Sequence, residues 1–179
     1  MLHEDIATEQ YENLRTRKTE MVLGRLSTTM TEPDLVAEPL FDEPLVVAAG
    51  SRSGWAKRRK LTLAELIGEP WVLPTPGSLA RSLQDEFFRK NGLEVPSASV
   101  LTVSLHLFMR LIETGRWLGL LPASTMWFGG HQLRLKVLPV SSLSPPAPVG
   151  LITVKHRTLT PLAERFIDCT RKIASMRRL

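Results

Sequence analysis

Residues 35–49 read LVAEPLFDEPLVVAA and predict two strands joined by a change of direction. The segment is apolar enough for buried strands, but Pro39 and Pro44 interrupt it, and proline is confined to strand edges and bends. We therefore expect one strand to end near Asp42 and another to begin after Pro44. Residues 145–148 form a second proline-marked crossing. The chain is thus expected to pass twice between two lobes, with a ligand cleft between them.

Strands and helices alternate along the rest of the chain. Short apolar runs predict strands over residues 21–24, 71–73, 99–103, 118–121, 133–140 and 149–154. Apolar residues spaced by three and four predict helices over residues 6–18, 79–91 and 104–113, and a last helix from Pro161. This alternation predicts an α/β fold, a sandwich with mainly parallel sheets.

Hydroxyl side chains mark the expected helix starts. Thr62-Leu63-Ala64-Glu65 has the pattern of a capping box that opens one short helix, and Ser78 and Thr160 are placed as N-caps. Tyr11 and Leu14 are expected on the apolar side of the first helix. The last helix is expected to bury its larger apolar residues, Leu162, Phe166, Cys169 and Ile173.

The composition is that of an ordinary globular protein. Of 179 residues, 43% are hydrophobic and 23% are charged, and the net charge is +5. No stretch approaches the ~20 apolar residues of a membrane span, and no signal pattern opens the chain. Cys169 is the only cysteine, which excludes an intramolecular disulfide and fits a reducing cytoplasm. We therefore expect a cytoplasmic protein that does not associate with membranes.

No pattern of residues indicates catalysis, so an enzyme is not expected. Ser78 follows a glycine but lacks the Gly-x-Ser-x-Gly pattern of a nucleophile elbow, and a helix cap explains it better. The four histidines have no metal-ligand spacing with one another or with Cys169, and there is no phosphate-binding loop. Two basic clusters, at residues 57–60 and 171–178, are interpreted as a solvated loop and a helix end. The sequence therefore predicts no catalytic residue, no metal and no cofactor.

A series of short motifs runs in a fixed order along nearly the whole chain. The segments are residues 13–15 (NLR), 20–26 (EMVLGRL), 38–47 (EPLFDEPLVV), 61–66 (LTLAEL), 70–74 (PWVLP), 115–124 (ending LLPAS) and 148–151 (PVGL). Each is weak by itself, but their order and spacing resemble the effector-sensing half of LysR-type transcriptional regulators. The final helix completes the resemblance.

The resemblance implies the two-lobed, type 2 periplasmic-binding-protein-like fold, with Rossmann-like lobes joined by a hinge. Regulatory lobe one would comprise residues 1–45 and 148–179, and regulatory lobe two residues 46–147. In such regulators a small metabolite binds between the lobes and changes how a homodimer or tetramer holds promoter DNA. DNA would be contacted only through an N-terminal winged helix-turn-helix, which this chain lacks.

The resemblance also implies a strand and a helix of lobe one that would come before Met1. That strand would lie beside residues 21–23, and its absence would leave backbone groups unpaired. We expect the empty place to be filled by residues 1–3, by another chain or by local disorder.

The effector site is expected, by the same resemblance, at turns that precede helices. Free backbone N–H groups and the helix dipole favour an anion there. The expected site residues are Ile6, Ala7, Arg25, Gly77, Ser78, Thr102, Val103 and Ser104. The three hydroxyls could donate hydrogen bonds to an anionic effector, and Arg25 could pair with its carboxylate. Helix capping and a solvated arginine are the competing roles.

The chain departs from its relatives at three of the positions compared. Ile6 stands where many relatives have a hydroxyl residue, and Trp117 and Arg17 stand where glycine is usual. These departures indicate a larger, more apolar ligand than usual, or a decayed site. The leading hypothesis is a sensor domain for a sugar acid or an aromatic acid. The alternatives are a free-standing solute-binding protein and a truncated remnant that dimerises with full-length regulators.

Overall fold

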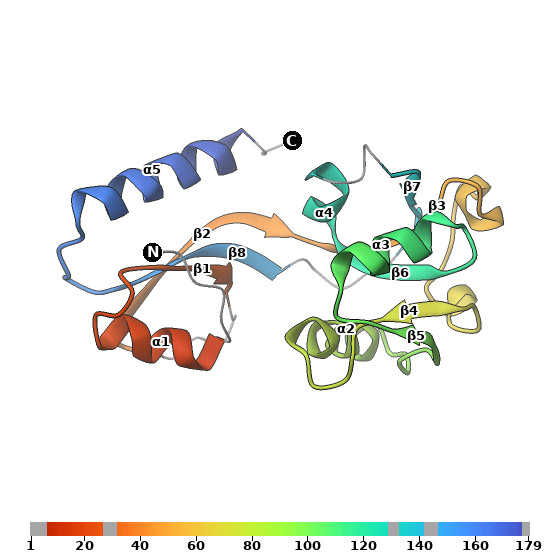
Figure 1. Ribbon diagram of the computed structural model, residues 1–179, viewed down its shortest axis with the longest axis horizontal. Coiled ribbons are helices and arrows are strands. Elements are labelled where there is room, and N and C mark those ends of the chain that lie inside the picture. Colours follow the sequence, from red (N-terminus) through yellow and green to blue (C-terminus); the bar gives the residue numbers. More distant parts are fainter. Residues whose placement is uncertain (1–6, 27–31, 129–132, 142–146, 177–179) are drawn as a thin grey trace. The chain divides into compact units, whose positions relative to one another are not determined.

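The chain of the computed structural model divides into two units, each built on its own β-sheet (Figure 1). Unit 1 comprises Met1–Glu43 and Pro146–Leu179, and unit 2 comprises Pro44–Pro145. The structure describes residues 7–26, 32–128, 133–141 and 147–176. Both changes of unit fall at the proline-marked segments of the sequence, after Glu43 and after Pro145, and Pro44 separates the strand Leu35–Glu43 of unit 1 from the strand Leu45–Gly50 of unit 2.

The described part of unit 1 contains a three-stranded antiparallel sheet in the order β1-β8-β2, with α1 and α5 on opposite faces (Figure 1). Its elements are α1 (Ala7–Arg15), β1 (Val22–Arg25), β2 (Leu35–Glu43), β8 (Ala147–Val154) and α5 (Pro161–Ser175). Side chains of the central strand alternate between two cores because successive residues of a strand point to opposite faces. Ile152 packs with Leu14 of α1, whereas Leu151 packs with Ile167 of α5.

Strand β1 is paired along one edge only within the described residues, where its partner is β8. The strand that the resemblance implies beside residues 21–23 has no counterpart among those residues. Residues 1–3, which were suggested to fill that place, lie outside the described part of the chain.

Unit 2 contains a mixed sheet in the order β5-β4-β6-β3-β7. Its elements are β3 (Leu45–Gly50), the 3-10 turns η1 (Gly54–Lys57) and η2 (Ala64–Leu66), β4 (Trp71–Leu73), α2 (Leu79–Lys90), β5 (Ala98–Leu101), α3 (Leu105–Glu113), β6 (Leu118–Pro122), α4 (Ala123–Phe128) and β7 (Leu135–Val137). Side chains of β4 also alternate between two cores, one on each face of the sheet. Trp71 and Leu73 pack with Phe88 of α2, whereas Val72 packs with Phe108 and Ile112 of α3.

Gly119 lets α3 lie directly on β6. A Cβ atom at this position would overlap Ile112 Cδ1 and would lie 2.7 Å from Phe108 Cε1. Both side chains are buried, so neither is free to move aside. The glycine between two apolar strand residues is therefore a packing requirement.

Two fold expectations were wrong. The sheets are not mainly parallel, because among the strands of the described residues only β4 with β5 and β4 with β6 pair in that sense. The strands that carry the chain across the prolines, β2, β3 and β8, all pair antiparallel with their neighbours. Hydrophobic periodicity identifies strands but contains no information about their direction.

The buried face of α5 was the second wrong expectation. Thr160 caps this helix as predicted, but the helix buries Ala163, Ile167 and Ala174. The four residues expected in the core are exposed, and they are Leu162, Phe166, Cys169 and Ile173. Two alanines on the buried face allow the helix backbone to approach the sheet closely, so small residues occupy the contact. Arg171 stabilises this contact between α5 and the sheet at the exposed surface. Its guanidinium donates two hydrogen bonds to the Glu38 carboxylate of β2, of 2.7 and 2.8 Å.

Several smaller expectations need adjustment. The first helix is described from Ala7 and ends at Arg15, and the strand expected over residues 133–140 is only three residues long. At Thr62 the backbone N–H and the hydroxyl both donate to the Glu65 carboxylate, without the reciprocal bond of a capping box, and the segment opens a single 3-10 turn rather than an α-helix. Among the described residues, no helix is both long and apolar enough to cross a membrane.

Candidate ligand-binding site

The carboxyl ends of β4 and β5 meet at one edge of the sheet of unit 2. The two strands are parallel neighbours, with Leu73 opposite Leu101, and the backbone N–H of Thr102 donates to the carbonyl of Leu73 at 3.1 Å. Each strand leads through a short turn into a helix, β4 into α2 and β5 into α3. Open α/β sheets bind ligands at the carboxyl ends of their strands, which makes this edge a candidate ligand site.

Ser78 is the N-cap of α2, as the sequence predicts. Its Oγ accepts from the backbone N–H of Arg81 at 3.2 Å and donates to the carbonyl of Thr75 at 2.8 Å. The preceding Gly77 has a φ of +83°, a conformation that side chains of L-residues rarely adopt. The glycine is therefore required by the turn, and the Ser78 hydroxyl already uses its hydrogen within the turn.

Thr102 and Ser104 form a second capped turn with unused hydrogen-bonding capacity. Thr102 Oγ1 accepts from the backbone N–H of Ser104 at 3.0 Å, and Ser104 Oγ accepts from that of Leu107 at 3.3 Å. Within the described residues neither hydroxyl hydrogen has an acceptor, so both remain available to a ligand. The first N–H groups of α3 also point out of the helix end, as they do in every α-helix.

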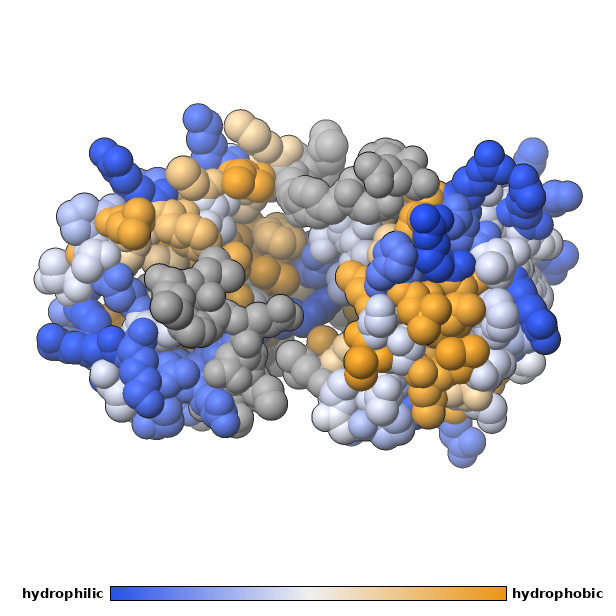
Figure 2. All heavy atoms as spheres, viewed as in Figure 1, coloured by the Kyte–Doolittle hydropathy of each residue, from blue (hydrophilic) through white to orange (hydrophobic). Residues whose placement is uncertain are grey.

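Apolar side chains surround these hydroxyls and are exposed. Val103 is 80% exposed, Leu105 is 54% exposed, and Leu101 and Leu107 are about half exposed. Figure 2 shows apolar side chains gathered over the same side of unit 2. Leu105 lies on α3 with Phe108, Met109 and Ile112, of which only the latter three are buried. The edge therefore combines hydrogen-bond donors with an uncovered apolar surface.

Arg25 lies in unit 1, at the end of β1. It is opposite Val149 of β8, and Glu43 of β2 is opposite Ala147, so the four residues share one face of the sheet. Arg25 Nη2 is buried and has no hydrogen-bond partner within the described residues. Burial lowers the pKa of the guanidinium, and the negative charge of the buried Glu43 opposes that effect. The position thus holds a cation with an unused N–H group.

The expected site residues are divided between the units. Arg25 belongs to unit 1, and Ala7 is the first described residue of its helix α1. Ile6 lies outside the described residues. The other five belong to unit 2, where the structure brings them to the edge formed by β4 and β5, namely Gly77, Ser78, Thr102, Val103 and Ser104. The family resemblance led to these positions, and capping was the competing role for their hydroxyl groups.

A cavity that the sequence analysis did not anticipate also lies in unit 2. It has a volume of about 470 Å³ and is lined by Ser53, Gly54, Trp55, Arg58, Glu69, Gly115, Arg116 and Leu118. The available signal was a tryptophan within the otherwise polar segment 51–60. In the described part of the chain, no cluster of three or more metal-binding side chains is present.

Comparisons with known proteins agree with the motif order. The model of the LysR substrate binding domain matches residues 1–175. The transcriptional regulator GalR of Pseudomonas putida is 30% identical over 168 residues, which are 94% of this chain and 41% of GalR. The chain thus spans less than half of that relative. The activator CmpR of Synechocystis is 23% identical over 166 residues.

Solved effector-binding domains have the same fold. That of BenM, solved with its effector benzoate, has a TM-score of 0.76 and 23% identity, covering 98% of this chain and 78% of that one. That of QuiR, in complex with shikimate, has a TM-score of 0.70 and 18% identity, covering 98% and 81%. The predicted two-lobed, periplasmic-binding-protein-like α/β fold is confirmed. Since the family model matches nearly its whole length, the chain belongs to the LysR substrate-binding domain family.

Proposed function

We propose that this chain is the effector-sensing domain of a LysR-type transcriptional regulator and that a small organic acid binds at the edge formed by β4 and β5. The observation that carries the proposal is the pair of hydroxyl groups at Thr102 and Ser104, whose hydrogens have no acceptor in the described residues. They stand at the start of α3, where backbone N–H groups and the helix dipole favour negative charge.

The apolar surface beside these hydroxyls favours an acid with a flat or hydrocarbon body. Covering exposed valine and leucine side chains with a ligand is favourable by about 25 cal/mol for each Å² of apolar surface removed from water. Val103 and Leu105 offer such a surface, whereas a sugar acid would place hydroxyl groups against it. Of the two classes expected from the sequence, the aromatic acid therefore fits this edge better.

Arg25, in unit 1, is proposed separately as an anion-binding group of its own unit. Its buried Nη2 lacks a hydrogen-bond partner in the described residues, and an unmade bond to a buried charged group is costly. A ligand carboxylate would supply the missing acceptor.

The relatives support the regulatory part of the proposal. GalR and CmpR are named as transcriptional regulators, and the domains of BenM and QuiR were solved with benzoate and shikimate. We propose that the full-length regulator acts in the cytoplasm as a homodimer or tetramer. It would contact DNA through a separate N-terminal helix-turn-helix domain.

Ligand-induced thermal stabilisation tests this proposal. Benzoate, shikimate and 2-PG, the last being the ligand in the solved regulatory domain of CcmR from Synechocystis, are added to the chain and to a Thr102→Val/Ser104→Ala variant. Each melting temperature is compared with that of the same protein without ligand. Binding to the folded state stabilises it by about 2.7 kcal/mol when the free ligand concentration is 100 times Kd. This stabilisation raises the melting temperature. We expect a rise with benzoate that the double substitution reduces.

Thr160→Val is the matched control, because Thr160 also caps a helix with its hydroxyl but lies in α5. It should lower the melting temperature without ligand, as loss of a cap does, and leave the ligand-induced rise unchanged. An equal reduction of that rise in both variants would contradict the assignment of the site. No rise with any of the three acids would contradict binding of this class of ligand.

A further inference from the structure

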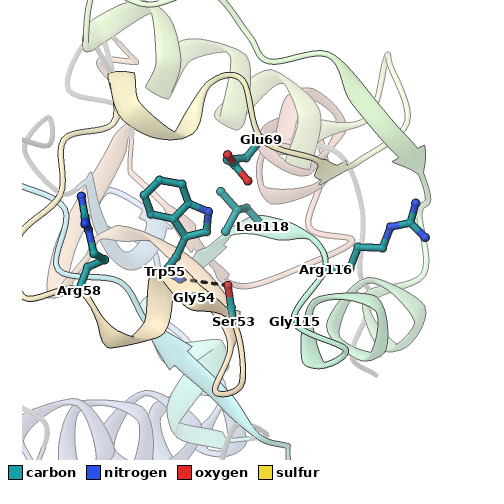
Figure 3. A pocket seen from close by; sticks show the side chains of 8 residues that line it. All are labelled: Ser53, Gly54, Trp55, Arg58, Glu69, Gly115, Arg116 and Leu118. Atoms are coloured by element: carbon teal, nitrogen blue, oxygen red, sulfur yellow. Dashed lines mark hydrogen bonds between the residues drawn. The ribbon is translucent and has the colours of Figure 1, made fainter.

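The cavity of unit 2 lies away from the edge formed by β4 and β5, among η1, the turn at Gly115 and the segment after η2 (Figure 3). Its volume of about 470 Å³ falls in the range of small-molecule sites. Gly115 has a φ of +81°, and a Cβ there would lie 3.2 Å from the Ser53 backbone nitrogen. The close approach of these two turns, which both line the cavity, therefore favours glycine at this position.

Two apolar side chains form the inner wall of the cavity. Leu118 is buried at the start of β6, and Trp55 is partly buried on η1. In Figure 3 the indole ring and Leu118 border the same space. A hydrocarbon group placed there would cover the exposed part of the indole ring, since Leu118 is already buried.

Three polar groups at this wall have hydrogen-bonding capacity that the described residues do not use. Ser53 is only 6% exposed, and its Oγ accepts from the Trp55 backbone N–H at 3.3 Å, which leaves its hydroxyl hydrogen free. The indole N–H of Trp55 has no acceptor in the described part of the chain. The Glu69 carboxylate likewise has no hydrogen-bond or ion-pair partner there. In Figure 3 this carboxylate and the nitrogen-bearing edge of the indole lie beside Leu118.

Two guanidinium groups lie at the margins. Arg58 stacks over the Trp55 ring at 5.9 Å and is 3.8 Å from the Glu65 carboxylate, and Arg116 stacks over Trp117 at 5.1 Å. The negative charge of Glu69 would repel a ligand that carries only a negative charge, and the two arginines would repel a ligand that carries only a positive charge. A molecule that carries both charges avoids each repulsion.

We propose that this cavity binds a free amino acid with a hydrocarbon side chain, as a second ligand site that is independent of the effector edge. The ligand ammonium donates to the Glu69 carboxylate, which gains the cationic partner that it lacks. The ligand carboxylate accepts from the Ser53 hydroxyl and the Trp55 indole N–H, and the hydrocarbon group of the ligand covers the exposed part of the Trp55 ring. Each of the unused polar groups thereby obtains a partner of complementary chemistry.

Nuclear magnetic resonance of the indole N–H groups tests the proposal directly. The chain has four tryptophans, and Trp55→Phe identifies the signal of Trp55. L-leucine is titrated first, followed by 3-methylbutylamine and 4-methylpentanoate, which each retain one of its two charges. We expect L-leucine to shift the Trp55 signal and to bind at least about tenfold more tightly than either analogue, the loss that one charge-assisted hydrogen bond causes.

Two variants separate the cavity from other surfaces. Glu69→Gln should weaken L-leucine binding about tenfold and leave 4-methylpentanoate binding unchanged or stronger, because the lost charge repels that anion. Glu94→Gln removes an exposed carboxylate outside the cavity and should change nothing. Ser104→Ala should also leave L-leucine binding unchanged, which distinguishes this site from the effector edge. The proposal is overturned if L-leucine fails to shift the Trp55 signal, if the amine binds as tightly, or if Glu69→Gln has no effect.

Discussion

Replacement of Trp71 by phenylalanine examines the core that supports the edge of β4. Trp71 is fully buried, its indole N–H donates to the Leu66 carbonyl at 2.8 Å, and its ring meets that of Phe88 edge-on with centroids 5.4 Å apart. Trp71→Phe keeps an aromatic ring and removes the donor and part of the ring volume. The Leu66 carbonyl keeps its bond from the Glu69 backbone N–H, at 3.1 Å, so it is not left without a donor.

The expected loss follows from these two changes. The hydrogen bond contributes about 1 kcal/mol net, since the carbonyl retains one partner. The space left by the smaller ring adds about 1–2 kcal/mol, as truncations in rigid cores do. The free energy of unfolding should therefore fall by about 2–3 kcal/mol, which for a chain of this length corresponds to about 4–12 °C in Tm.

Urea denaturation followed by far-ultraviolet circular dichroism measures this loss without relying on tryptophan fluorescence. Trp55→Phe is the matched control, because the Trp55 indole N–H has no acceptor in the described residues and its ring is partly exposed. That variant should lose less than about 1 kcal/mol. Equal losses in the two variants, or no loss in Trp71→Phe, would refute the role given to the buried indole bond.

Three further predictions concern the packing of helices on the sheets and one ion pair. Gly119→Ala should lower the free energy of unfolding by about 1–3 kcal/mol, because its Cβ overlaps buried side chains of α3. Ile167→Ala should cost about 2–4 kcal/mol and Ile173→Ala under about 1 kcal/mol, because only the former residue is buried. Arg171 lowers the pKa of Glu38 below its usual 4.5 by hydrogen bonding. The stability that this pair contributes is therefore present above about pH 4.5 and lost as the pH falls through the lower, folded-state pKa.

Each of these has its own check. Gly54→Ala is the control for Gly119→Ala, because nothing lies within 4 Å of a Cβ there, and urea midpoints of the two should differ clearly. For the isoleucines, thermal melts suffice, and a larger loss at Ile173 would restore the face expected from the sequence. For the ion pair, urea midpoints of Arg171→Ala and the parent chain should differ at neutral pH and converge in acid. A constant difference across the pH range would contradict the linkage.

Local signals predicted most of the elements correctly. The prolines at 39 and 44 located the change from β2 to β3, and hydroxyl residues located the starts of α2 and α5. These features act over a few residues, so the sequence alone contains them. Strand direction and order depend instead on distant segments such as β8, which pairs with both β1 and β2.

Helix faces were predicted less well where small residues make the contact. In α5 the larger apolar side chains led us to predict the wrong buried face. The face that packs against the sheet contains Ala163 and Ala174. In α2 the buried polar residue Gln84, which donates to the Leu120 carbonyl at 2.8 Å, interrupts an apolar pattern and could not be recognised as a core residue. Hydrophobicity ranks side chains by size and polarity, whereas packing also selects for close approach and for hydrogen-bond partners.

The candidate site was predicted only in part. Capping patterns at Ser78 and the motif order led to the edge formed by β4 and β5. Only the structure shows that the Ser78 hydroxyl donates its hydrogen to a carbonyl within its turn, whereas the Ser104 hydroxyl has no acceptor in the described residues. The cavity beside Trp55 was not foreseen, because its lining comes from three separate segments of the chain.

The central claim is that the turn from Thr102 to Ser104 binds the effector. It is tested most directly by following the backbone amide signals of the chain during titration with benzoate. We predict saturable shifts that are largest at Thr102, Ser104 and the first residues of α3, and that are lost in the Thr102→Val/Ser104→Ala variant. Saturable shifts confined to other parts of the chain, or no shifts at all, would contradict the claim.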